Sequence, residues 1–172
     1  MGAFINMNSF DDKFKESQDT SEKFDEFIKN LDISIAELEK SGAFFLTLGY
    51  SNFFRGADLD VLEILERNFT GDSPAEVTLI GQQFVLMGYV ILYIVALKRY
   101  DEKQLRLTQG NENINLAPYK ILTEAYLASA CANYLRYLAF SQILKDSFEN
   151  CPHEKSFNYL RSSFHIKLLY AI

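Results

Sequence analysis

The residues from Val77 to Leu97 form the longest uncharged stretch of the sequence, with 21 positions that carry no Asp, Glu, Lys or Arg. A helix of this length rises about 30 Å, which matches the hydrocarbon core of a bilayer. The stretch also suits the central helix of a soluble bundle, because such a helix is apolar on every side. The rest of the sequence has to decide between these two structures.

Several features favour a soluble core helix. Gln82 and Gln83 lie inside the stretch, where lipid penalises polar amides. If 77–97 alone crossed a membrane, Lys98 and Arg99 would place the C-terminal half in the cytoplasm, and the acidic residues 1–76 would have to be translocated without a recognisable signal sequence. Other segments also carry apolar faces that need a covering surface. We therefore expect a soluble bundle, with membrane insertion of 77–97 as the alternative.

The fold is predicted to be all-α, a single-domain bundle of five or six helices. Gly and Pro are scarce, with eight and three copies, which disfavours a β fold with many tight turns. Ser73-Pro74-Ala75-Glu76 has the capping-box spacing, with proline at the first helical position, and predicts a long apolar central helix over 74–99. Asn115 predicts the start of a second long helix, over 116–148, which pairs with the first.

Shorter helices are expected on either side of this pair. Asp19 and Glu22 have capping-box spacing and predict a helix over 19–40, preceded by a polar, partly flexible arm of residues 1–18 in front of a helical domain of 19–172. The glycines that follow predict breaks, so that two further helices cover 43–54 and about 58–69. Residues 101–115 are expected to be a connection, and a last helix is expected over 154–171.

No residue set for catalysis, cofactor binding or metal binding is predicted. Cys131 and Cys151 are interpreted as reduced thiols of a cytoplasmic protein. His153 and His165 are twelve positions apart on one expected helix, about 18 Å in rise, so one metal cannot reach both. The formal net charge of −6 disfavours nucleic-acid binding.

Tyrosines and small residues on the two long helices are the candidate site residues. The tyrosines predict a ligand pocket or an interface between the helices. The alternative is ordinary core packing, in which each hydroxyl bonds a partner or reaches the surface. Gly81 and Gly88 are seven positions apart and predict a close helix crossing, in a soluble core or in lipid. The tyrosines are Tyr89, Tyr93, Tyr126, Tyr134 and Tyr137, and the expected partners of the glycines are Ala125, Ala128 and Ala132.

The leading functional hypothesis is a non-enzymatic helical module for protein–protein interaction or regulation, which self-associates as a homodimer. It depends on the absence of a catalytic set, the surplus of aromatic residues, and an acidic front half that can meet a basic back half between subunits. The first alternative is a membrane-associated or membrane-inserting protein that uses residues 77–97. The second is a small-molecule binder with a Tyr-lined pocket between the long helices.

Overall fold

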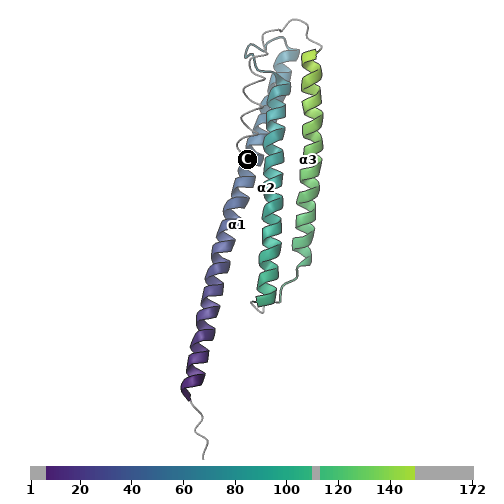
Figure 1. The fold of residues 1–172 in the computed structure, drawn as a ribbon. Coiled ribbons are helices and arrows are strands. Elements are labelled where there is room, and N and C mark those ends of the chain that lie inside the picture. Colours follow the sequence, from purple (N-terminus) through teal and green to yellow (C-terminus); the bar gives the residue numbers. More distant parts are fainter. Residues whose placement is uncertain (1–6, 110–112, 150–172) are drawn as a thin grey trace, which may run out of the picture.

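The fold is all-α, with three helices packed side by side as a bundle (Figure 1). The computed structural model describes residues 7–109 and 113–149, with side chains from 22 to 109 and from 113 to 147. Helix α1 spans Met7–Ile64, α2 spans Pro74–Gln109 and α3 spans Ala117–Glu149. Successive helices run antiparallel, and the long apolar α2 lies between α1 and α3.

The prediction of five or six helices is wrong, because three expected helices form one. Helix α1 runs without a break from Met7 to Ile64, so neither Asp19 nor the glycines at 42, 49 and 56 mark a boundary. All three glycines are buried against α2, and at Gly49 the two backbones lie so close that a Cβ would be 2.8 Å from the Gly81 carbonyl oxygen. Packing against α2 thus offsets the cost of about 1 kcal/mol that each glycine imposes on a helix.

The predicted starts of the two long helices are confirmed. The Val77 amide donates to the Ser73 carbonyl at 3.1 Å, and the Ala117 amide donates to Asn115 Oδ1 at 3.0 Å. Helix α2 continues to Gln109, ten positions past its expected end, so much of the expected connection is helical. The last predicted helix, with Cys151, His153 and His165, lies outside the described residues.

A short connection joins α1 to α2. Glu66 ends α1 in the left-handed region at φ 55°, and the Arg67 amide donates to the Leu62 carbonyl at 2.8 Å, as in a Schellman motif. Gly71 is also left-handed, at φ 76°. An ion pair between Arg55 and Asp72 holds this connection against the end of α1.

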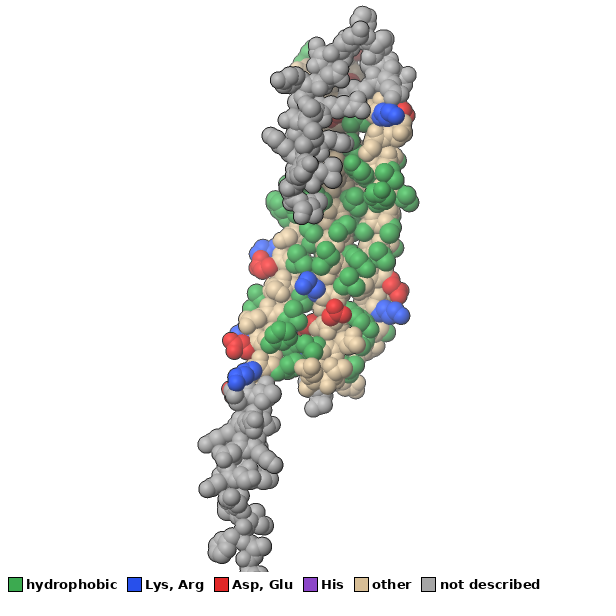
Figure 2. Space-filling view, in the orientation of Figure 1, with side chains coloured by type: hydrophobic (Ala, Val, Ile, Leu, Met, Phe, Trp, Pro, Cys, Tyr) green, Lys and Arg blue, Asp and Glu red, His purple; other side chains and the backbone are tan. Residues whose placement is uncertain are grey.

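The core is narrow and lies mostly between α1 and α2. The buried apolar residues are Ile28, Ile35, Leu59, Val77, Val85, Leu92, Val95, Ala96 and Ala130. Only two described side chains of α3, Ala130 and Asn133, are buried. Many large apolar side chains therefore stay exposed, and Figure 2 shows them gathered over the middle of the face that α2 and α3 form.

Candidate functional site: an apolar band across three helices

Each helix has one uncharged segment, and the three segments lie at the same level of the bundle. They are residues 41–54 of α1, 77–97 of α2 and 125–135 of α3, together called the apolar band. The contacts of Gly42 with Leu92 and of Gly49 with Gly81 align the first segment with the second. The hydrogen bonds of Gln82 with Asn133 align the second with the third.

Charged side chains lie at both ends of the apolar band. At one end Arg99 pairs with Glu39, and Arg106 reaches Asp32 at 2.7 Å. At the other end Arg55 pairs with Asp72. The described part of the bundle therefore has a charged layer, an uncharged layer and a second charged layer along its long axis.

Much of the apolar band is exposed, although its central helix was expected to be covered. Of the most apolar 18-residue window of α2, 44% is buried. The exposed apolar residues of α2 recur at helical spacing on one face: Ile80, Met87, Val90, Ile94 and Leu97. Phe44 and Phe54 of α1, and Leu127 and Leu135 of α3, continue this exposed surface around the bundle.

The glycines of the apolar band bring the backbones of α1 and α2 together. A Cβ on Gly49 would lie 2.8 Å from the Gly81 carbonyl oxygen, and one on Gly81 would lie 2.9 Å from the Gly49 carbonyl oxygen. A Cβ on Gly88 would lie 2.9 Å from the Gly42 carbonyl oxygen. Gly81 and Gly88 thus pack closely, but against α1 and not against α3.

The alanines expected to receive these glycines do not do so. Ala125, Ala128 and Ala132 are exposed on α3, and the nearest atoms to Gly81 and Gly88 all belong to α1. The glycines at 42, 49 and 56 repeat every seven residues, as Gly81 and Gly88 do. This matched spacing is a sequence signal for the pairing of α1 with α2, whereas by propensity alone the α1 glycines predict helix breaks.

A buried pair of amides joins α2 to α3. Gln82 is fully buried, and its Nε2 donates to the Asn133 carbonyl oxygen at 2.9 Å and to Asn133 Oδ1 at 3.1 Å. Asn133 Nδ2 in turn donates to the Ser129 carbonyl at 2.9 Å. The nitrogen of the Gln82 amide is therefore satisfied within the protein, whereas its buried Oε1 has no hydrogen-bond partner among the described residues.

Glu102 is buried at the charged end of α2, beyond the apolar band. Its carboxylate accepts from Arg106 Nε, and Lys103 Nζ lies 2.9 Å from Oε2. Burial raises the pKa of Glu102, but the hydrogen bonds and positive charges of Lys103 and Arg106 outweigh it and hold the pKa below its usual value. Because Arg106 also bonds Asp32 of α1, this cluster ties α2 to α1.

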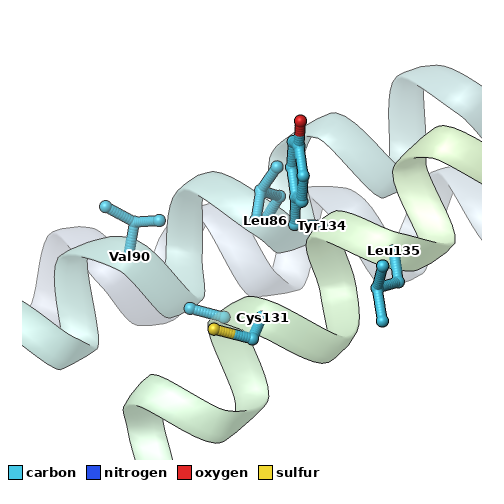
Figure 3. A pocket seen from close by; sticks show the side chains of 6 residues that line it. Leu86, Val90, Cys131, Tyr134 and Leu135 are labelled. Carbon is cyan, nitrogen blue, oxygen red and sulfur yellow. The ribbon is translucent and has the colours of Figure 1, made fainter.

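An open groove of about 450 Å³ lies between α2 and α3 within the apolar band (Figure 3). Leu86 and Val90 line it from α2, and Cys131, Tyr134 and Leu135 line it from α3, with Ala130 at its floor. Cys131 is an exposed free thiol. The groove wall contains no charged side chain, so it lacks the converging polar groups of a typical ligand pocket.

The candidate tyrosines do not gather around this groove. Tyr134 lines it, and Figure 3 shows Tyr134 beside Leu86. Tyr89 instead faces α1, where it hydrogen-bonds Tyr50. Tyr93, Tyr126 and Tyr137 are half-buried and do not line the groove.

Within the described side chains, no group of three or more His, Cys, Asp or Glu residues is placed to hold a metal ion. Of the described helices, α2 is long and apolar enough to cross a membrane by length and composition. Comparison with protein-family models, with curated proteins and with solved structures finds no match.

Proposed function

We propose that the protein is a non-enzymatic, membrane-embedded three-helix protein whose apolar band lies in the hydrocarbon core of a bilayer. One observation carries the proposal: the uncharged segments of three helices are aligned, exposed and bounded by charges at both ends. Water penalises such an exposed band, whereas lipid covers it.

The uncharged segment of α2 has the height of a bilayer core, about 30 Å, whereas those of α1 and α3 rise only about 21 and 16 Å, at 1.5 Å per residue. Lys40, Arg55, Glu124 and Arg136 border the two shorter segments, and all four side chains are exposed. The three long cationic side chains among them can extend toward the headgroups while their aliphatic stems stay in the apolar layer.

The internal contacts also suit lipid. Small residues at helix crossings allow close backbone packing, which drives helix association where no hydrophobic effect operates between helices. The Gly49–Gly81 and Gly42–Gly88 approaches are of this kind. The bonds from Gln82 to Asn133 keep the Gln82 amide group away from the lipid.

The three-helix arrangement removes the objection that the sequence raised against a span. A single span over 77–97 would require translocation of all preceding residues, but α1 runs antiparallel beside α2. If α1 also spans, the residues before it remain on the side of the α2–α3 connection, and only residues 55–76 cross between the first two helices. The cytoplasmic homodimer expected from the sequence is then the alternative, and it requires that the protein is soluble.

Two substitutions with matched exposure test the proposal. Ile94 is 40% exposed inside the apolar band, and Leu107 is 38% exposed on the same helix outside it. A lysine in the apolar segment of a membrane helix is unfavourable, by up to about 2.5–3.5 kcal/mol at the helix centre on insertion scales. We expect the wild-type protein and L107K to remain with the membrane pellet after carbonate extraction, and I94K to be lost from it.

A soluble protein would behave differently in the same assay. Wild type and both variants would be recovered in the supernatant without detergent, and I94K would be at least as soluble as wild type. That result contradicts membrane embedding. Light scattering on such a soluble sample would then show whether a second copy covers the exposed face of α2.

A further inference from the structure

The two ends of the bundle differ in their content of Lys and Arg. Residues 98–124, which include the connection from α2 to α3, carry five: Lys98, Arg99, Lys103, Arg106 and Lys120. Residues 55–76, which include the connection from α1 to α2 at the other end, carry two, Arg55 and Arg67, among six acids. The last part of α3 lies at this same end and adds Arg136 and Lys145. The basic end also receives Lys40 of α1, since Glu39 next to it pairs with Arg99.

This asymmetry sets an orientation, because short loops rich in Lys and Arg stay on the cytoplasmic side of a membrane, and acidic residues have little effect. The cytoplasmic leaflet is also the anionic one, and each cation near its surface contributes about 1 kcal/mol. Several of these cations stay accessible, since Lys40, Lys98 and Lys120 are exposed.

We infer that the protein inserts in one orientation, with the end that carries residues 98–124 against the anionic cytoplasmic leaflet and the 55–76 connection on the opposite side. This inference depends on the proposed membrane embedding and adds the surface that each end contacts. The beginning of α1 then lies on the cytoplasmic side together with the end of α2, since both helices are anchored there by the Arg106–Asp32 pair.

Cysteine accessibility tests the orientation. In a background that replaces Cys131 and Cys151 with alanine, Phe69→Cys and Asn113→Cys each place one thiol in a connection at one end, and both positions are exposed. In intact cells, a membrane-impermeant maleimide should label Phe69→Cys and leave Asn113→Cys unlabelled. After permeabilisation with detergent it should label both, which shows that each thiol is reactive.

The outcomes separate the two proposals. Labelling of Asn113→Cys in intact cells, or protection of Phe69→Cys there, overturns the orientation while the chain still pellets with membranes. Recovery of both variants in the soluble fraction overturns the orientation and the membrane embedding together.

Discussion

At Gly49 the main chains of α1 and α2 approach so closely that even one methyl group has no room. A Cβ there would lie 2.5 Å from Val85 Cγ2, 2.8 Å from the Gly81 carbonyl oxygen and 2.9 Å from the Val85 amide nitrogen. Two of these atoms are backbone and can move only if the helices separate. We expect G49A to lower the free energy of unfolding by about 1–3 kcal/mol, as other overpacked cores show.

Gly42 provides the matched control for this prediction. Its Cβ would meet only side-chain atoms, Leu92 Cγ at 3.0 Å and Ile91 Cγ2 at 3.2 Å, which can shift by a few tenths of an ångström. Alanine is also favoured over glycine in a helix by about 1 kcal/mol, so G42A should change stability little. Unfolding followed by circular dichroism in mixed micelles measures both variants, and equal effects would show that the Gly49 contact is not special.

Glu102 makes stability depend on acid. Because Lys103 and Arg106 hold the folded-state pKa of Glu102 below the usual pKa of a glutamate, its contribution is fully present above that usual pKa and is lost as pH falls through the folded-state pKa. The variant E102Q keeps the shape but loses the charge, and hydrogen bonds to charged groups contribute about 1.5–3 kcal/mol. We expect E102Q to be less stable than wild type by about this amount at pH 7.

The pH profile separates the charge of Glu102 from its packing. The difference between wild type and E102Q in thermal midpoint should shrink as the pH falls through the lowered folded-state pKa of Glu102. A difference that stays constant over the whole acid range in which both proteins are folded would mean that the loss comes from packing and not from the ion pairs with Lys103 and Arg106.

At the scale of the helix, α3 depends on the Gln82–Asn133 contact, because its only other buried described side chain is Ala130. In N133L, Gln82 Nε2 keeps the Asn133 carbonyl oxygen but loses Oδ1, and in Q82L Asn133 Oδ1 loses its donor from α2. Q82L and N133L should therefore each destabilise the fold, whereas the double variant should lose less than the sum. A double-mutant cycle should give a coupling of about 0.5–1.5 kcal/mol, as for other hydrogen bonds between membrane helices. Additive losses would mean that the two amides do not act together.

The sequence predicted the elements whose ends have local signals. Pro74 and Asn115 sit at helix starts that capping chemistry determines within one turn, so the starts of α2 and α3 were predicted to within a residue. Helix α1 was divided wrongly because Gly42, Gly49 and Gly56 are breakers by propensity alone. Their role depends on a partner helix more than 20 residues away, which local pattern does not contain.

The candidate site was predicted less well, for a related reason. Gly81 and Gly88 were placed correctly at a close helix crossing, but its partner depends on which face of α2 meets which neighbour. A helix that is apolar on all sides gives no periodicity from which to read that face. For the same reason the sequence does not show which helix each tyrosine faces. Tyr89 and Tyr134 were expected in one pocket, but Tyr89 faces α1 and Tyr134 lines the groove between α2 and α3.

At the scale of the whole molecule, the order of charged and uncharged layers along the bundle suits a protein that folds in a membrane. All three helices contribute exposed large apolar side chains to the apolar band, among them Phe44, Ile94 and Leu127. The ion pairs at its two ends, Arg99–Glu39 and Arg55–Asp72, join adjacent parts of the chain at the levels where a bilayer becomes polar. In the proposed membrane state, insertion and correct assembly of the helices therefore favour the same arrangement.

Helix α1 begins at Met7 and extends well past the end of the bundle, beyond the Arg106–Asp32 pair (Figure 1). The part from Met7 to Phe27 is about 30 Å long at 1.5 Å per residue. From Gly49 to Met7 the helix measures about 63 Å, so a tilt of about 10° at the Gly49 crossing would displace the Met7 end sideways by about 11 Å. Small rearrangements between α1 and α2 would thus be converted into large displacements at the far end of the first helix.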